Sequence, residues 1–207
     1  MLKISIIGIH DVSDKWSKLR SDLRAKAASM ALNKVAAKGK TELTRAITAE
    51  FAISAAEVRS SVNLSPARAK EAAIEARIDI FGSAKKRGRS LNVIHFLEKR
   101  ITLAEAHRRM KKGTLYAAGQ RGRKHPVLGF KFKKTGGGKQ IEGVFIGNKG
   151  RTVFVRTGDK RLPIKPVQMI GVSQMFSTNK ITERVMERID REMVVEFDRA
   201  ISLLLRK

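Results

Sequence analysis

Residues 178–205 read TNKITERVMERIDREMVVEFDRAISLLL, and this stretch decides the fold class of the chain. Its apolar residues recur every three or four positions and form one stripe: Ile181, Val185, Ile189, Met193, Phe197, Ile201 and Leu204. Such spacing is typical of an amphipathic α-helix, because residues three and four apart lie on one side of the helix. The rest of the surface is mixed, with seven basic and six acidic residues over 177–207. The stretch therefore predicts a long C-terminal helix that packs through its apolar stripe.

A second stripe with the same spacing runs from about Ser13 to Ala49. It predicts a long N-terminal helix, which Gly39 bends or divides. Ser54 followed by Glu57 is a capping box, in which the hydroxyl and the carboxylate accept hydrogen bonds from free N–H groups at the start of a helix. This pair predicts a second, short helix directly beyond it.

Outside these helices, apolar and polar residues alternate with the two-residue period of β-strands. Residues 73–80, AIEARIDI, give the firmest pattern, and residues 2–7 give a shorter one. Leu128, Phe130 and Phe132 alternate with glycine and lysine, a triple glycine follows as a turn, and the strands IEGVFIG and TVFVRTG come next. These three successive strands predict an antiparallel meander whose first hairpin turns Leu128 and its apolar neighbours inward.

The order of elements predicts a single α+β domain over residues 1–207, in which the antiparallel meander packs against the long N-terminal and C-terminal helices. Residues 83–126 are rich in Gly, Lys and Arg, and we expect a mobile basic loop excursion within that domain. Within the excursion, 92–97 is a strand or the start of a helix, and 101–113 is a short helix that ends at Gly113.

The charge of the chain is strongly positive and unevenly distributed. Forty-four Lys and Arg residues against 19 Asp and Glu give a net charge of +25. Residues 81–140 hold 17 of the basic residues and only two acidic ones. Charge of this density repels itself in a compact protein, so it implies an acidic partner.

Three interpretations of the basic region stay open: a solvated face, a surface for an acidic protein, or a surface for nucleic acid. Nucleic acid would be held through its phosphates, with little regard to base sequence and with strong salt dependence. The residues predicted to contact DNA or an acidic partner are Lys85, Lys86, Arg87, Arg89, Arg121, Arg123, Lys124, Lys131, Lys133 and Lys134. Only one Trp and one Tyr are available to stack on bases, and most Phe residues occupy core-like positions in the pattern.

The sequence carries no pattern that predicts catalysis, a metal site or a cofactor site. GGGKQ is not a phosphate-binding loop, because Lys133 stands where that loop needs glycine and Gln140 where it needs Ser or Thr. The four histidines are scattered, and cysteine is absent. The apolar runs are too short for a signal peptide or a membrane helix. We therefore expect a protein that is not an enzyme, binds no metal or cofactor and does not enter a membrane.

The segment RTGDKRLPIKPVQMIGVSQMF, residues 156–176, lies between the glycine-rich meander and the final helix. With this motif, and with the order of AASMALNKVAAKGKTELTRAI, FAISAAEVRSSV, AAIEARIDI and NVIHF before it, the chain resembles the lambda-like phage and prophage minor tail protein Z family. The residues that belong to the matching motif are Arg156, Arg161, Pro163, Ile164 and Pro166. Another interpretation of Pro163 and Pro166 is that they fix an extended segment before the final helix.

The resemblance implies a structural protein of a long-tailed phage or prophage: a tail-completion or neck component at the head–tail junction, assembled as a homo-oligomeric ring. It implies the tail tube, the tail terminator or head-closure proteins as partners, the virion tail or neck as location, and the host cytoplasm during assembly. Double-stranded DNA is a further partner that the charge alone suggests. The alternative is a monomeric nucleic-acid-binding protein without sequence specificity, which would bind DNA tightly without forming oligomers.

Overall fold

The chain forms two compact units, each continuous in space but not in sequence. Unit 1 comprises residues 1–48, 55–89 and 171–207, and unit 2 comprises residues 49–54 and 90–170. The computed structural model describes residues 2–7, 20–71, 73–83, 90–98, 128–141, 143–149, 151–158 and 162–206. Unit 1 contains long helices and both units contain antiparallel sheet, so the α+β class is confirmed. That the two units behave as the single domain expected from the sequence stays a prediction.

A three-stranded antiparallel sheet in the order β1-β3-β2 forms one layer of unit 1. Its strands are β1 (Leu2–Ile7), β2 (Val62–Ser65) and β3 (Glu75–Ile80). In the central strand β3, Ala76, Ile78 and Ile80 are fully buried, as the alternation in AIEARIDI predicts. Strand β2 has no counterpart among the expectations from the sequence.

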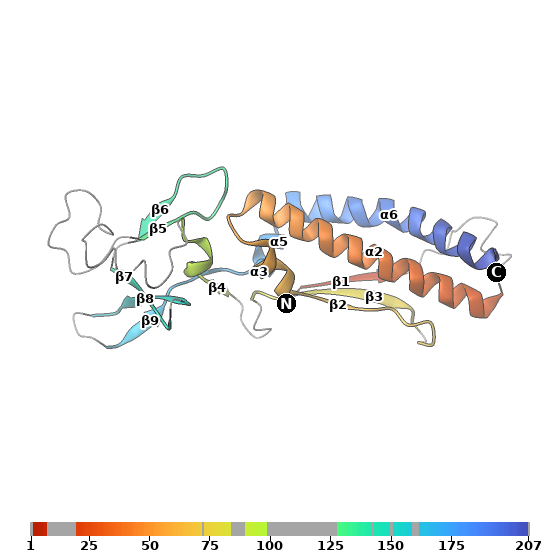
Figure 1. The fold of residues 1–207 in the computed structure, drawn as a ribbon, viewed down its shortest axis with the longest axis horizontal. Coiled ribbons are helices and arrows are strands. Elements are labelled where there is room, and N and C mark those ends of the chain that lie inside the picture. Colours follow the sequence, from red (N-terminus) through yellow and green to blue (C-terminus); the bar gives the residue numbers. More distant parts are fainter. Residues whose placement is uncertain are drawn as a thin grey trace. The chain divides into compact units, whose positions relative to one another are not determined.

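Helices α2 (Ser21–Glu50) and α6 (Asn179–Leu205) form the second layer of unit 1 and lie side by side along the sheet (Figure 1). Every residue of the predicted apolar stripe of α6 is buried, which confirms that prediction. Two short helices complete the unit: α3 (Ala55–Ser60), which starts directly after Ser54 as predicted, and α5 (Val172–Phe176) before α6. The part of the predicted N-terminal helix before residue 20 lies outside the described residues.

Gly39 does not divide α2, which runs unbroken from Ser21 to Glu50. The glycine serves packing instead. A Cβ atom at this position would lie 3.1 Å from Cδ1 of Ile78 in β3 and 3.2 Å from Cδ1 of Ile189 in α6. The missing side chain thus lets α2 pack closely against the sheet and against α6 at the same point.

Unit 2 is built from short strands. They are β4 (Ser90–Asn92), β5 (Leu128–Phe130), β6 (Lys139–Ile141), β7 (Val144–Gly147), β8 (Thr152–Arg156), β9 (Ile164–Pro166) and β10 (Gln168–Ile170), with the 3₁₀ helix η1 (Val93–Phe96) after β4. They pair as β10-β4, β5-β6 and β7-β8-β9, all antiparallel. Val93, Leu128, Phe130, Val144 and Val153 form the buried core between them.

The predicted meander is only partly correct. Strands β5 and β6 form the expected hairpin with Leu128 and Phe130 buried. IEGVFIG as one strand is wrong, because Gly143 takes a φ of +72° and separates β6 from β7. The true meander is β7-β8-β9. The layer arrangement is also corrected: the sheet under the long helices is β1-β3-β2, whereas the meander belongs to unit 2 and has its own core.

Asn92 joins three elements of unit 2. Its side-chain amide donates hydrogen bonds to the carbonyl oxygens of Val153 at 3.1 Å and Val167 at 2.9 Å. Its side-chain oxygen accepts hydrogen bonds from the N–H groups of Val153 at 2.9 Å and Ile94 at 3.1 Å. This places the sequence NVIHF, which was ambiguous between strand and helix, as the end of β4 followed by η1.

Replacing Gly39 by leucine tests the packing of α2. We expect the free energy of unfolding to fall by about 1–3 kcal/mol or more, because the new side chain has no space between Ile78 and Ile189. Chemical denaturation measures the change, and Thr41→Leu on the exposed face of the same helix is the control. Equal stability of the two variants would contradict the proposed role of Gly39.

Candidate functional site

Three of the ten residues predicted to contact DNA or an acidic partner lie in the described part of the chain. These are Lys131, Lys133 and Lys134, in the loop that follows β5. Lys85, Lys86, Arg87, Arg89, Arg121, Arg123 and Lys124 lie outside the described residues. The helix predicted at 101–113 lies outside them too, so the expected mobile excursion is described only at residues 83 and 90–98.

Backbone hydrogen bonds hold the loop that carries the three lysines. The N–H of Lys131 donates to the carbonyl oxygen of Phe96 at 2.8 Å, and that of Lys134 donates to the carbonyl oxygen of Glu50 at 2.8 Å. The side chains of Lys133 and Lys134 are exposed, and Nζ of Lys133 lies 3.4 Å from the Glu50 carboxylate. One of the three cations is therefore partly neutralised, and the others are available to a partner.

The described part of unit 2 is strongly basic. Its acidic residues are Glu50 and Glu98, against Lys131, Lys133, Lys134, Lys139, Lys149, Arg151, Arg156 and Lys165. Both carboxylates are already engaged within the unit. Glu50 pairs with Lys133, and the Glu98 carboxylate lies so close to Gly129 and Gly138 that a Cβ at either would be 2.8 Å from its Oε2. The last glycine of the triple glycine thus makes room for Glu98, a role beyond the turn predicted for it.

Two aromatic residues on the meander were not predicted as site residues. Phe145 of β7 and Phe154 of β8 are directly opposite in register and stack with ring centroids 5.9 Å apart. The guanidinium carbon of Arg156 lies 5.1 Å from the centroid of the Phe145 ring. Because side chains alternate along a strand, the sequence predicts that Phe145 and Phe154 lie on the other face of the sheet from the valines next to them. It does not show which of the two faces is buried.

The residues of the family motif lie along the meander. Arg156 ends β8, Ile164 and Pro166 belong to the edge strand β9, and Pro163 directly precedes it. Arg161 lies outside the described residues. Pro166 lies in a strand at the edge of the sheet, where the lack of an N–H group is tolerated. Any role of these residues in the family's function stays a prediction.

In unit 1, a cluster of charges lies between α2 and α6. Lys38 of α2 donates hydrogen bonds to both Glu192 and Glu196 of α6, whose residues are only 8% and 3% exposed. Arg188 pairs with Glu192 at 2.6 Å, and Arg199 pairs with Glu196 at 2.6 Å. Burying two carboxylates is costly unless cations compensate them, and here three cations do so.

The cluster shifts the pKa values of Glu192 and Lys38 in opposite directions. The hydrogen bond from Lys38 lowers the pKa of Glu192 below its ordinary 4.5, because it stabilises the ionised carboxylate. The hydrogen bonds to Glu192 and Glu196 raise the pKa of Lys38 above its ordinary 10.5. Both shifts favour the charged forms of Glu192 and Lys38 at neutral pH.

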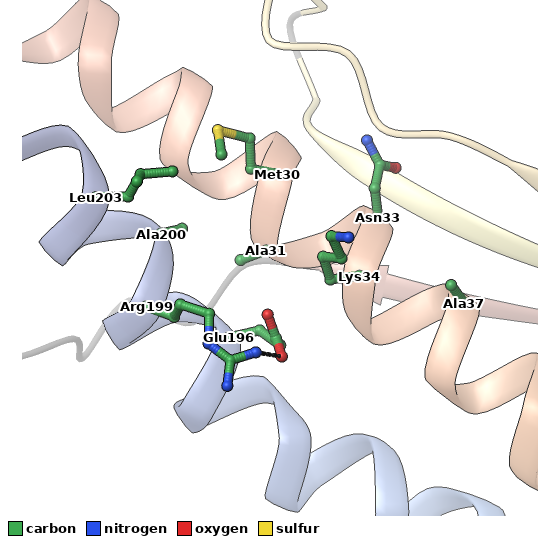
Figure 2. Close-up of a pocket in the computed structure, with 9 residues that line it drawn as sticks. All are labelled: Met30, Ala31, Asn33, Lys34, Ala37, Glu196, Arg199, Ala200 and Leu203. Atoms are coloured by element: carbon green, nitrogen blue, oxygen red, sulfur yellow. Dashed lines mark hydrogen bonds and ion pairs between the residues drawn. The ribbon is translucent and has the colours of Figure 1, made fainter.

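Next to this cluster, α2 and α6 enclose a groove of about 520 Å³ (Figure 2). Met30, Ala31 and Ala37 of α2 and Ala200 and Leu203 of α6 give it apolar walls. Charge enters it from Lys34 and from the Glu196 carboxylate, which is held by Arg199. The groove offers an apolar side chain contact area with charged groups close by.

The described residues contain no group of three His, Asp or Glu side chains that could hold a metal ion. Among the helices that the structure describes, none is long and apolar enough to cross a membrane. The described residues thus form an α+β protein with two notable surfaces: a basic sheet that carries two partly buried aromatic rings, and a helix layer with an open groove.

Over residues 6–207 the sequence matches the family model described as Prophage minor tail protein Z (GPZ), and the chain belongs to this family. It is therefore a phage minor tail protein with a structural role, and it interacts with other tail components in the virion tail. The resemblance on residues 156–176 is thereby confirmed at the level of the family. No curated protein and no solved structure matches the sequence.

The pKa shift of Glu192 predicts how stability depends on pH. A carboxylate whose pKa is lowered by folding contributes stability above its unfolded pKa and loses it as pH falls through the folded pKa. We therefore expect Glu192→Gln to be less stable than the parent protein at pH 7 and to lose less stability between about pH 5 and about pH 3.

Thermal denaturation across this pH range measures both effects. The control is Glu187→Gln, which removes an exposed carboxylate from the same helix and should leave the pH dependence close to that of the parent. Identical pH profiles for Glu192→Gln and the parent would contradict the role given to the Lys38 cluster.

Proposed function

We propose that the chain is a tail-completion or neck component at the head–tail junction, that it assembles into a homo-oligomeric ring, and that its basic region contacts DNA or an acidic tail partner. The observation that carries the proposal is the family match over residues 6–207. The role requires neither catalysis nor a metal or cofactor. Its partners would be further copies of the chain and the tail tube, tail terminator or head-closure proteins.

Exposed apolar side chains on α6 support self-association. Of the eight exposed large hydrophobic residues among those described, five lie on this helix: Met186, Val194, Val195, Leu203 and Leu205. Val194 is 65% exposed in the middle of the helix. These residues are spread around the helix, so we propose Val194, the most exposed of the five, as the point of contact. A ring needs two different contact surfaces on each copy, because its contacts are head-to-tail.

The charge explains why the ring would need further partners. Copies with a net charge of +25 repel one another when a ring brings them together. Unit 1 carries mixed charge on its helices, whereas the described part of unit 2 has eight basic and two acidic residues. A ring built through unit 1 would therefore leave the basic units free to bind DNA phosphates or acidic protein surfaces.

The first test is the absolute mass in solution of the parent protein, Val194→Asp and Leu162→Asp, at about 0.15 M and about 1 M salt. We expect the parent to form discrete oligomers that persist at high salt, because apolar contacts build them. Val194→Asp should dissociate them, because it places a charge in the interface. Leu162→Asp is the matched control, because Leu162 of unit 2 is also 65% exposed.

One outcome would contradict the ring, and another would contradict only the place proposed for its interface. One is a monomeric parent at both salt concentrations that joins duplex DNA only at the lower one, which favours a monomeric nucleic-acid-binding protein. The other is an oligomer that Val194→Asp leaves intact, which removes α6 from the interface.

The second test concerns the basic region. Replacing Lys85, Lys86, Arg87 and Arg89 by serine should weaken binding to duplex DNA and flatten its salt dependence, by about 0.9 in log–log slope for each phosphate that the variant no longer neutralises. Replacing Lys131, Lys133 and Lys134 by serine should act in the same way. The matched control is the triple change Lys180→Ser, Arg191→Ser and Arg206→Ser, which removes equal charge from exposed positions on and just beyond α6.

Fluorescence anisotropy with a labelled duplex, titrated at several salt concentrations, measures the slopes. A control variant whose slope falls as much as that of the variant at Lys131, Lys133 and Lys134 would show that total charge, not this surface, attracts DNA.

A further inference from the structure

The β7-β8-β9 sheet (Figure 1) has one face that is not part of the core of unit 2. This face carries two aromatic side chains, Phe145 and Phe154. Val144 of β7 and Val153 of β8 are fully buried and belong to that core. Successive side chains of a strand point to opposite faces, so Phe145 and Phe154 lie on the other face. Both are only partly buried and neither packs in the core cluster.

The two rings form one continuous platform. They stack at 5.9 Å with an angle of 28° between their planes, and Pro166 of β9 lies beside Phe154 in register. Gly147 keeps the surface flat at one end, because a Cβ there would lie 3.0 Å from Cδ2 and Cε2 of Phe154. At the other end, the Arg156 guanidinium lies over the Phe145 ring.

Cations lie at one end of this platform. Lys149 and Arg151 are exposed in the turn between β7 and β8, whereas Lys165 of β9 pairs with Val155 and therefore lies on the core side of the sheet. No Asp or Glu occurs in the described residues of these three strands or of that turn. A partly exposed aromatic surface with cations at one end matches the chemistry of nucleotides, which combine a flat base with a phosphate.

We propose that this face binds single-stranded nucleic acid, with unpaired bases stacked on the Phe154 ring and on the Arg156 guanidinium that covers Phe145, and with phosphates held by Lys149 and Arg151. The bases of a duplex are already stacked on one another, so only unpaired bases can use the ring faces. Arg156 completes the site by stacking on Phe145 and adding positive charge next to a bound base. This site rests on the proposed function, in which the chain contacts DNA in the phage tail, and it specifies that DNA as single-stranded.

The test compares affinity for a labelled single strand of about 16 nucleotides, oligo(thymidylate), with affinity for a duplex of the same length. The variants are Phe145→Leu and Phe154→Leu, which keep apolar side chains on the strands. Phe81→Leu is the matched control, because Phe81 is also half-buried but belongs to unit 1.

We expect each platform variant to bind the single strand about tenfold more weakly, since stacking on an aromatic side chain contributes that order of affinity for each base. Duplex affinity should change by less than about twofold, because phosphate contacts dominate it. Unchanged single-strand affinity in both platform variants would overturn the proposal. So would an equal loss of single-strand and duplex affinity.

A second variant keeps the proposal testable if the leucine variants fold poorly. Phe145→Trp retains an aromatic platform and adds a fluorophore to a chain with one native Trp. Stacking of bases should quench the added fluorescence on titration with the single strand but not with the duplex. Absence of this difference at saturating single strand would overturn the proposal.

Failure of this site is distinguishable from failure of the proposed function. The single-strand preference is measured on the free chain, whereas the ring is measured by mass and by Val194→Asp. A monomeric protein that still prefers the single strand keeps the site and loses the ring. A ring whose Phe145 and Phe154 variants bind the single strand normally keeps the ring and loses the site.

Discussion

The ion-pair cluster around Lys38 fixes how the two long helices of unit 1 lie against each other. Glu192 and Glu196 stand one turn apart on α6, both nearly buried, and Lys38 of α2 donates to both. Sliding α6 by one turn would separate at least one carboxylate from Lys38 and leave it nearly buried with only the arginine of its own helix as a partner, which is unfavourable. Gly39, the next residue of α2, allows the close contact with Ile78 and Ile189. Charge and shape therefore select the same register, and the groove between the helices follows from it.

This arrangement also explains how the positive charge is distributed. Carboxylates are scarce in the chain, and most of the described ones lie in unit 1, many of them on α6. Unit 2 has two described carboxylates: Glu50 pairs with Lys133, and Glu98 packs against Gly129 and Gly138 of the β5-β6 hairpin. The lysines and arginines of the meander consequently have little internal compensation. In the ring proposed above, this distribution would allow assembly through the helix layer and leave the sheet to a polyanion.

The sequence predicted features that depend on residues close together in the chain, and it missed features that depend on residues far apart or on a backbone dihedral. The stripe of α6 and the alternation of β3 were predicted correctly, because burying one side of a helix or strand leaves a periodic signal. The packing role of Gly39 was missed. Within a helix, glycine predicts only a weak point, whereas the close packing that Gly39 allows is against Ile78 and Ile189, which are distant in sequence. The stretch IEGVFIG was misjudged because alternation does not reveal a backbone dihedral such as the φ of +72° at Gly143. The same holds for the candidate site. The lysines after β5 were predicted as site residues from the sequence, whereas Phe145 and Phe154 were not.

By itself, the sequence determined the α+β class, the two long helices, the excess of basic residues and the family, because each depends on composition, periodicity or a contiguous motif. Only the tertiary structure decided that the helices pack on the β1-β3-β2 sheet, that Lys38 compensates two buried carboxylates, and that Phe145 and Phe154 stack on the sheet face away from the core, with Arg156 over Phe145. The physical reason is that these features join residues far apart in the chain or depend on which face of a strand is covered. Neither long-range pairing nor the choice of the buried face leaves a mark in local sequence.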